Sequence, residues 1–228
     1  MRVHFHEELE RLELDVLGMG ELAEHAVQRA VQALVEDDAE RMRAVVSDDD
    51  VIDARYVDVE QRTFQVLALQ TPVASDLRMV SVVLHSSLHL ERIADMAVNI
   101  AKIAESVRGL PRSDRVLARI QEMGDVVRPM IRASMDALAR RDLDLCMQLP
   151  SMDDPVDRLN LGIYKEVLAL SDDRATLDWG LRMVIVARQL ERVGDHAVDI
   201  AEQVGFLITG EFREFTDASH PVDLEGDA

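Results

Sequence analysis

Acidic side chains at helical spacing occur in two similar twelve-residue segments of this chain. Residues 90–101 read LERIADMAVNIA, and residues 190–201 read LERVGDHAVDIA. Residues four apart lie on one face of a helix, so each segment predicts a stripe of three polar side chains. The stripes consist of Glu91, Asp95 and Asn99, and of Glu191, Asp195 and Asp199. Like charges at this spacing destabilise a helix by about 0.2–0.5 kcal/mol per pair, so a bound cation would explain why the pattern occurs twice.

Oxygen donors of this kind are the ligands of hard cations. Carboxylate and amide oxygens suit magnesium, calcium, manganese or iron, whereas zinc more often recruits nitrogen or sulfur. One helix supplies only two or three ligands, so a neighbouring helix must supply the others. The candidates are acidic residues at the expected starts of two other helices: Asp50 and Asp53, and Asp154 and Asp157. We therefore predict a metal site at each stripe, with N-capping as the alternative role of these four residues.

A solvated acidic surface is the alternative interpretation of the stripes themselves. Around the predicted helix, Leu90, Ala94 and Ala97 fall on one side, and the acidic residues fall on roughly the opposite side. The carboxylates are therefore expected to face solvent or the opposite bundle, outside the core of their own bundle.

Histidines lie beside both stripes. His196 directly follows Asp195 and is a candidate additional ligand, but the equivalent residue of the first segment is Met96, so a symmetric role is not expected. His85 and His89 are one helical turn apart and precede the first stripe. No other feature of the sequence supports a metal role for this pair.

The elements that position these residues are helices throughout, because apolar residues recur at intervals of three and four along the chain. The segments 47–50 and 150–151 predict a break in the second helix of each half. Asp50 and Asp53 recur as Asp154 and Asp157, which together with the paired twelve-residue segments indicates an internal duplication. We predict an all-α protein of two tandem, pseudo-symmetric three-helix bundles with spectrin-like packing, over residues 1–109 and 110–212, and an acidic flexible tail over residues 213–228.

Charge and cysteine content restrict the partners and the compartment. The 228 residues include 44 Asp and Glu but only 25 Lys and Arg, for a net charge of −19. Such a chain repels nucleic acid and anionic lipid and attracts cations or basic protein surfaces. The single cysteine, Cys146, excludes an internal disulfide and a multi-thiolate metal site. Without a long apolar segment, direct membrane insertion is not expected, and we predict a cytoplasmic location.

Motifs of common enzyme classes are absent from the sequence. It has no glycine-rich phosphate loop, no Gly-x-Ser-x-Gly segment and no Cys/His pairing. The Glu-x-x-His segments of di-iron four-helix bundles are also missing. We therefore predict a protein without enzymatic activity, with no catalytic residues and no organic cofactor site.

Three segments of the chain carry a family resemblance. They are QTPVASDLRMV (70–80), LERIADMAVNIAK (90–102) and LERVGDHAVDIAEQVGFLITGEF (190–212). With the acidic segments 50–53 and 154–157, the chain resembles the PhoU family, regulators of phosphate uptake, as far as about Phe212. This resemblance implies two three-helix bundles. It also implies multinuclear metal clusters, of iron or zinc with manganese or magnesium as alternatives, held by Glu91, Asp95, Glu191 and Asp195, with Asn99 and Asp199 as neighbours.

The same resemblance implies a function and a set of partners. Members of the family act as negative regulators when phosphate is plentiful, between the ATPase of a phosphate ABC transporter and a phosphate-sensing histidine kinase. A homodimer is also expected. Two alternatives remain open: a metal-independent acidic adaptor that binds basic partner surfaces directly, and a carboxylate-bridged metalloenzyme such as a phosphatase.

Overall fold

The structure is a computed structural model that describes residues 2–69 and 72–215. Six helices form most of this part of the chain. They are α1 (Arg2–Glu36), α2 (Ala39–Leu69), α3 (Ser75–Ser106), α4 (Asp114–Arg140), α5 (Leu143–Leu168) and α6 (Arg174–Thr209). In each helix the buried residues recur every three or four positions, as Leu12, Val16, Met19 and Ala23 do in α1, which places one apolar face on the core.

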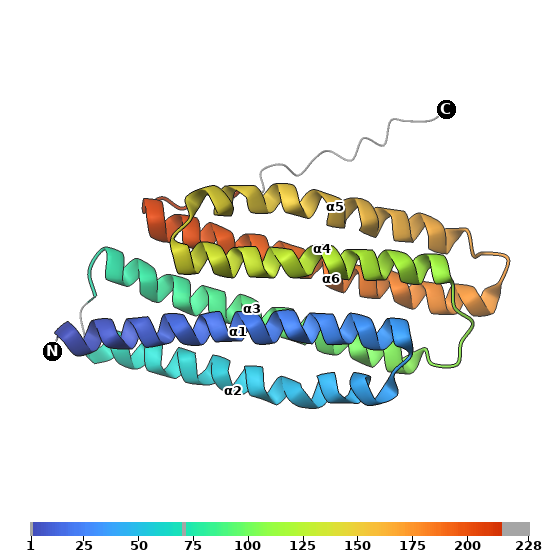
Figure 1. Cartoon of the computed structure of the whole chain (residues 1–228), viewed down its shortest axis with the longest axis horizontal. Coiled ribbons are helices and arrows are strands. Elements are labelled where there is room, and N and C mark those ends of the chain that lie inside the picture. Colours follow the sequence, from blue (N-terminus) through green and yellow to red (C-terminus); the bar gives the residue numbers. More distant parts are fainter. Residues whose placement is uncertain (1, 70–71, 216–228) are drawn as a thin grey trace.

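The helices form two three-helix bundles that lie side by side (Figure 1). Helices α1, α2 and α3 make the first bundle, and α4, α5 and α6 make the second. The bundles join where α3 packs against α6 and α1 packs against α4. Helices α2 and α5 lie at opposite edges of the molecule, and each contacts the two other helices of its own bundle (Figure 1). The predicted all-α fold class is therefore confirmed.

Helices α2 and α5 are continuous, so the breaks predicted at residues 47–50 and 150–151 are wrong. The serines that suggested a new N-cap bond to the preceding turn instead. Ser47 Oγ donates to the carbonyl of Ala44 at 3.1 Å, and Ser151 Oγ donates to the carbonyl of Gln148 at 2.7 Å. A side chain bonded in this way leaves the helix intact, because the backbone keeps its own hydrogen-bond partners.

Tertiary packing supplies the stabilisation that local propensity lacks at these two segments. In α2 the buried residues Val45 and Ile52 lie on either side of the acidic turn. In α5 the equivalent buried residues, Leu149 and Val156, lie on either side of Pro150. Burial of one such side chain is worth about 1.5–3 kcal/mol, which exceeds the propensity loss of the acidic turn in α2. A proline inside a helix costs about 3 kcal/mol, so in α5 the burial of Leu149 and Val156 together offsets Pro150.

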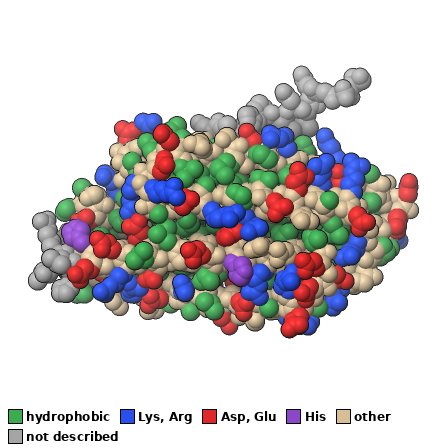
Figure 2. Space-filling view, in the orientation of Figure 1, with side chains coloured by type: hydrophobic (Ala, Val, Ile, Leu, Met, Phe, Trp, Pro, Cys, Tyr) green, Lys and Arg blue, Asp and Glu red, His purple; other side chains and the backbone are tan. Residues whose placement is uncertain are grey.

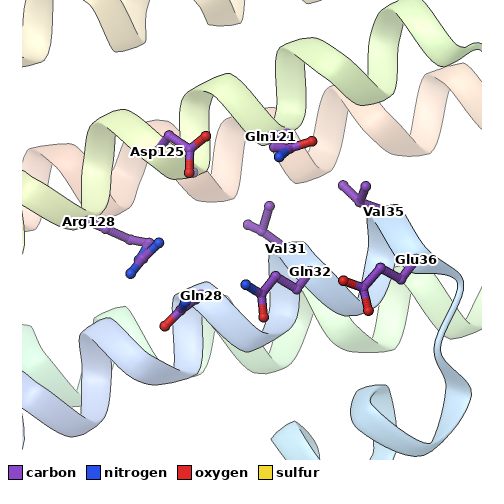
Figure 3. A pocket seen from close by; sticks show the side chains of 9 residues that line it. Gln28, Val31, Gln32, Val35, Glu36, Gln121, Asp125 and Arg128 are labelled. Atoms are coloured by element: carbon purple, nitrogen blue, oxygen red, sulfur yellow. The ribbon is translucent and has the colours of Figure 1, made fainter.

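Two ion pairs and a close helix approach join α1 to α4. Glu24 pairs with Arg128 at 2.7 Å, and Glu13 pairs with Arg141 at 2.7 Å. Both glutamates are mostly buried, so these pairs also fix the register of the two helices. Close to them, a small polar cavity lies between the helices (Figure 3). Val31 points across this cavity toward α4, where Gly124 leaves room for its methyl groups (Figure 3).

Positive and negative side chains alternate on the face formed by α1 and α4 (Figure 2). The excess negative charge of the chain is not gathered into one patch on this face. None of the helices in the described part of the chain has the length and hydropathy needed to cross a membrane.

The segment that follows α6 begins by folding back onto the bundle. The backbone N–H of Phe215 donates to Glu202 Oε1 at 2.6 Å, and its ring packs against the core. Residues 216–228, which make up most of the predicted flexible tail, lie outside the described residues.

Gly162 and Gly124 offer a matched test of the packing between α1 and α4. A Cβ added at Gly162 on α5 would meet no atom within 4 Å, whereas one added at Gly124 would lie 3.1 Å from two methyl groups of Val31. Replacing a mid-helix glycine by alanine favours the helix by about 0.8–1 kcal/mol. We expect Gly162→Ala to raise the free energy of unfolding by that amount in urea denaturation. We expect Gly124→Ala to raise it less or to lower it, and equal gains would contradict the close approach.

Candidate metal centre

The first acidic cluster lies between α2 and α3, with two carboxylates from each helix. Its members are Asp49, Asp53, Glu91 and Asp95. The charges of Asp53 and Asp95 act on Asp49, and those of Asp95, Asp53 and Asp49 act on Glu91. Each helix contributes a pair of acids four residues apart, so two acidic stripes face one another.

The second acidic cluster repeats this arrangement between α5 and α6. Its members are Asp153, Asp157, Glu191 and Asp195. The charges of Asp157 and Asp195 act on Asp153, and Glu191 lies one helical turn before Asp195. The internal duplication therefore produces two equivalent groups of four carboxylates, one in each bundle.

One arginine is bonded to each cluster, and the two arginines occupy different positions. Arg92 Nη1 donates to Asp95 at 3.0 Å in the first cluster. In the second cluster Arg188 Nη1 donates to Glu191. Both arginine side chains are more than half exposed. In the first cluster the charge of Lys102 also acts on Asp49. Even so, each group of four carboxylates has more negative charges than the cations beside it.

Several oxygens in the clusters are buried without a hydrogen-bond partner among the described residues. They are Asp153 Oδ1 and Glu191 Oε2, and also Glu91 Oε2, which has an ion-pair contact with Arg92 Nε at 3.3 Å but no hydrogen bond. Asp153 Oδ1 lies directly against α6 at Gly194, where a Cβ would collide with it. Buried polar atoms are nearly always paired, so unpaired carboxylate oxygens suggest a ligand. A set of carboxylate oxygens fits a hard cation such as iron, manganese or magnesium.

The structure places Asp49 and Asp153 in the clusters, which the sequence reasoning missed. Asp50 and Asp154, which were predicted instead, are exposed on α2 and α5, as Asp53 and Asp157 also are, and their charges act on Asp49 and Asp153 from the next position in the chain. The predicted breaks misled this choice, because they treated these acids as helix starts. In a continuous helix, Asp49 precedes Asp53 by four residues and Asp153 precedes Asp157 by four residues. The same spacing that identified Glu91 and Asp95 could therefore have identified these residues.

The third members of the two stripes have different surroundings from the clusters. Asn99 is exposed on α3. Asp199 turns toward two histidines, with Oδ2 at 3.4 Å from His89 Nδ1 and 3.2 Å from His196 Nδ1. Among the described Asp, Glu, His and Cys residues, these three form the group whose ligand atoms all lie within 4.8 Å of one another. Neither acidic cluster meets that distance, so its carboxylates would have to move together to share one ion.

Comparison with known proteins identifies the family. A family model described as "PhoU domain" matches residues 16–104 and 120–204, which is more than half of the chain. The chain belongs to the PhoU family. The resemblance found in residues 70–80, 90–102 and 190–212 is thus confirmed.

Similar proteins and structures cover nearly the whole chain. A Clostridium acetobutylicum protein named "Phosphate-specific transport system accessory protein PhoU homolog" is 33% identical over 215 residues, 93% of this chain and 98% of that protein. A Caulobacter vibrioides relative of the same name is 34% identical over 208 residues, 91% of this chain and 90% of that protein. The crystal structure of PhoU from Pseudomonas aeruginosa superposes with a TM-score of 0.86 at 33% identity, covering 91% of this chain and 100% of that one.

A second solved structure supports the same PhoU fold. The phosphate transport system regulatory protein PhoU from Streptococcus pneumoniae has a TM-score of 0.85 and 26% identity, and covers 92% of this chain and 99% of that one. Both superpositions span the two bundles, so the paired arrangement of α1–α3 and α4–α6 is shared with solved PhoU structures.

Both acidic clusters of this PhoU chain contain carboxyl groups with raised pKa values. Burial, followed by the charges of Asp53 and Asp95, raises the pKa of Asp49 to about 6. Burial, followed by the charges of Asp157 and Asp195, raises the pKa of Asp153 to about 7. Burial also raises the pKa of Glu91. The protein therefore holds protons in these clusters at pH values where an exposed aspartate is ionised.

These pKa shifts predict that the two clusters destabilise the metal-free PhoU protein as the pH rises. The folded state retains protons that the unfolded chain, with an ordinary aspartate pKa near 4, has already released. The contribution of these carboxylates to the free energy of unfolding should therefore fall as pH rises from about 4 to about 7, whereas His89, whose pKa burial lowers to about 4, contributes with the opposite sign. We expect Asp153→Asn to reduce this fall and to stabilise the metal-free protein by about 1–2 kcal/mol at pH 7.

Chelator-treated protein in urea denaturation at several pH values gives the measurement. Asp144→Asn on the exposed surface of α5 is the matched control, and it should leave the pH dependence in place. The same pH dependence in the wild type and in Asp153→Asn would show that Asp153 does not hold a proton in the folded protein.

Proposed function

We propose that this PhoU-family protein is a metal-dependent negative regulator of phosphate uptake in the cytoplasm. It links the ATPase of a phosphate ABC transporter to a phosphate-sensing histidine kinase, and it acts as a homodimer. Family membership supports the phosphate-regulatory part. So do the names of its relatives, which describe an accessory protein of a phosphate-specific transport system and a phosphate transport regulatory protein.

The metal part of the proposal rests on the buried carboxylate oxygens Asp153 Oδ1 and Glu191 Oε2, which have no hydrogen-bond partner among the described residues. Four carboxylates in each cluster provide enough oxygen ligands for more than one ion, so we propose multinuclear clusters. Iron or zinc is the expected metal, with manganese or magnesium as alternatives. Asp49, Asp53, Glu91 and Asp95 would hold the first cluster, and Asp153, Asp157, Glu191 and Asp195 the second.

Cations at these sites would hold α2 and α5, the helices at the edges of the molecule, more firmly in place. Asp49 and Asp153 would lose their protons, and their carboxylates would move toward the acids of α3 and α6. Each outer helix would then be fixed to the centre of its bundle by charge attraction as well as by its apolar face. Partners that contact α2 or α5 would meet an ordered surface, and this provides a physical route from metal occupancy to regulation.

Metal content tests the proposed ligands. We expect purified protein to retain iron, zinc or manganese after dialysis, as measured by elemental analysis. The α3/α6 carboxylate variant, with Glu91→Gln, Asp95→Asn, Glu191→Gln and Asp195→Asn, should lose most of this metal while its circular dichroism stays helical. Equal metal content in the two proteins would mean that these carboxylates are not the ligands.

A phosphate-starvation reporter tests the regulatory role. Deletion of the gene should activate the reporter in phosphate-rich medium, and the wild-type gene should silence it again. The α3/α6 carboxylate variant should fail to silence it, whereas the surface variant Asp144→Asn should succeed. Silencing by the carboxylate variant would favour the metal-independent adaptor. Hydrolysis of phosphate esters by metal-loaded protein would favour the metalloenzyme.

A further inference from the structure

His89, His196 and Asp199 meet at the seam between the two bundles, next to the second acidic cluster, where the charges of Asp199 and His196 act on Asp195. His89 belongs to α3, and the other two residues belong to α6. His89 Nδ1 and His196 Nδ1 are 3.0 Å apart. Asp199 Oδ2 is 3.4 Å from the first nitrogen and 3.2 Å from the second. Three potential ligand atoms from two bundles therefore form a nearly equilateral triangle.

The dimensions of this triangle match one face of a zinc coordination tetrahedron. Nitrogen and oxygen ligands lie about 2.0–2.1 Å from zinc, which separates neighbouring ligands by roughly 3.3 Å in a tetrahedron. The three measured separations lie close to that value. We propose that His89, His196 and Asp199 bind one zinc-class divalent ion that bridges the two bundles, with a fourth position for water.

The orientation of the side chains supports coordination through the Nδ1 atoms. The two imidazole rings are tilted by 49° with centroids 5.1 Å apart, so they are not stacked face to face and their Nδ1 edges converge. His196 Nε2 is buried without a hydrogen-bond partner among the described residues, so the polar contacts of this ring lie on its Nδ1 side. Both imidazoles are less than one fifth exposed, which protects a bound ion from exchange.

Asp199 provides the entrance to the site. Its side chain is 44% exposed, in contrast to the two imidazoles. An ion could therefore reach the triangle from solvent past this carboxylate, and water could occupy the open position on the same side. Two neutral imidazoles and one carboxylate form a donor set that zinc, cobalt and nickel accept readily. The acidic clusters instead offer oxygen atoms alone.

The site forms once, although the chain is duplicated. The residues equivalent to His89, His196 and Asp199 in the other half are Gln189, Met96 and Asn99. These three cannot supply a carboxylate or an imidazole. The proposed ion therefore breaks the pseudo-symmetry of the protein. It joins α3 to α6, the helix pair that already makes a large part of the contact between bundles.

Cobalt provides a direct test, because imidazole N–H protons of a Co²⁺-bound histidine give strongly shifted resonances. Metal-free wild-type protein titrated with Co²⁺ should show such resonances from a pair of histidines, and Zn²⁺ should displace them. We expect His89→Gln, which introduces the residue found at the equivalent position 189, to lose them. Its affinity for this ion should fall by about 100-fold or more, since a lost ligand exceeds the effect of a lost outer-shell contact.

Two control variants separate this site from the acidic clusters. His85→Gln changes the exposed histidine one turn earlier on α3 and should keep the resonances. The α2/α5 carboxylate variant, with Asp49→Asn, Asp53→Asn, Asp153→Asn and Asp157→Asn, should also keep them, because it leaves α3 and α6 unchanged. Loss of metal from the acidic clusters in this variant tests the proposed function, and it does so independently of the site formed by His89, His196 and Asp199.

Three outcomes would overturn the proposal. The first is a wild-type protein without Co²⁺-shifted imidazole resonances, in which a shared proton alone would join the two rings. The second is survival of the resonances in His89→Gln. The third is their disappearance in the α2/α5 carboxylate variant, which would place the ion in an acidic cluster. Matching thermal unfolding of the metal-free wild type and His89→Gln would exclude misfolding as the cause of a loss.

Discussion

Repulsion between carboxylates on facing helices is the constraint that the packing of each bundle must overcome. The apolar faces of α2 and α5 hold these helices against α3 and α6, and the same contact brings two acidic stripes together between each pair. Protons relieve part of the repulsion, as the raised pKa values of Asp49 and Asp153 show. Cations would relieve it more completely. A proton only removes the charge of one carboxylate, whereas a bound cation attracts all the ionised carboxylates around it.

The duplication gives the molecule two clusters with the same geometry but different surroundings. Gly194 allows Asp153 to lie against α6, whereas the first bundle has Ala94 at the equivalent position. Arg92 contacts Glu91 and Asp95 of the first cluster from the position next to Glu91, whereas Arg188 contacts Glu191 of the second cluster from one turn earlier. The histidines extend this divergence to the seam, where one half supplies His89 and the other supplies His196 and Asp199. Two copies of one unit have thus acquired distinct chemistry.

Much of the fold and three of the four residues in each cluster were predictable from local pattern. The three- and four-residue periodicity predicted the helices, and the spacing of Glu91 and Asp95 and of Glu191 and Asp195 predicted one acidic stripe in each bundle. In the opposing stripe Asp53 and Asp157 were predicted, but Asp50 and Asp154 were named where the structure places Asp49 and Asp153. The reason is that serine and proline signals favour a helix break locally, while the buried residues Val45 and Ile52 hold the real helix straight through that turn.

The sequence by itself determined the helical periodicity, the duplication, the excess of negative charge and the family. All of these depend on residues near one another in the chain or on composition. Only the tertiary structure decided which acids of α2 face α3, which oxygens are buried without partners, and that His89 meets His196 across the seam. Those contacts depend on how far one helix rotates and slides against another. The packing of the two apolar faces against each other fixes that rotation. The sequence of one helix alone therefore does not determine it.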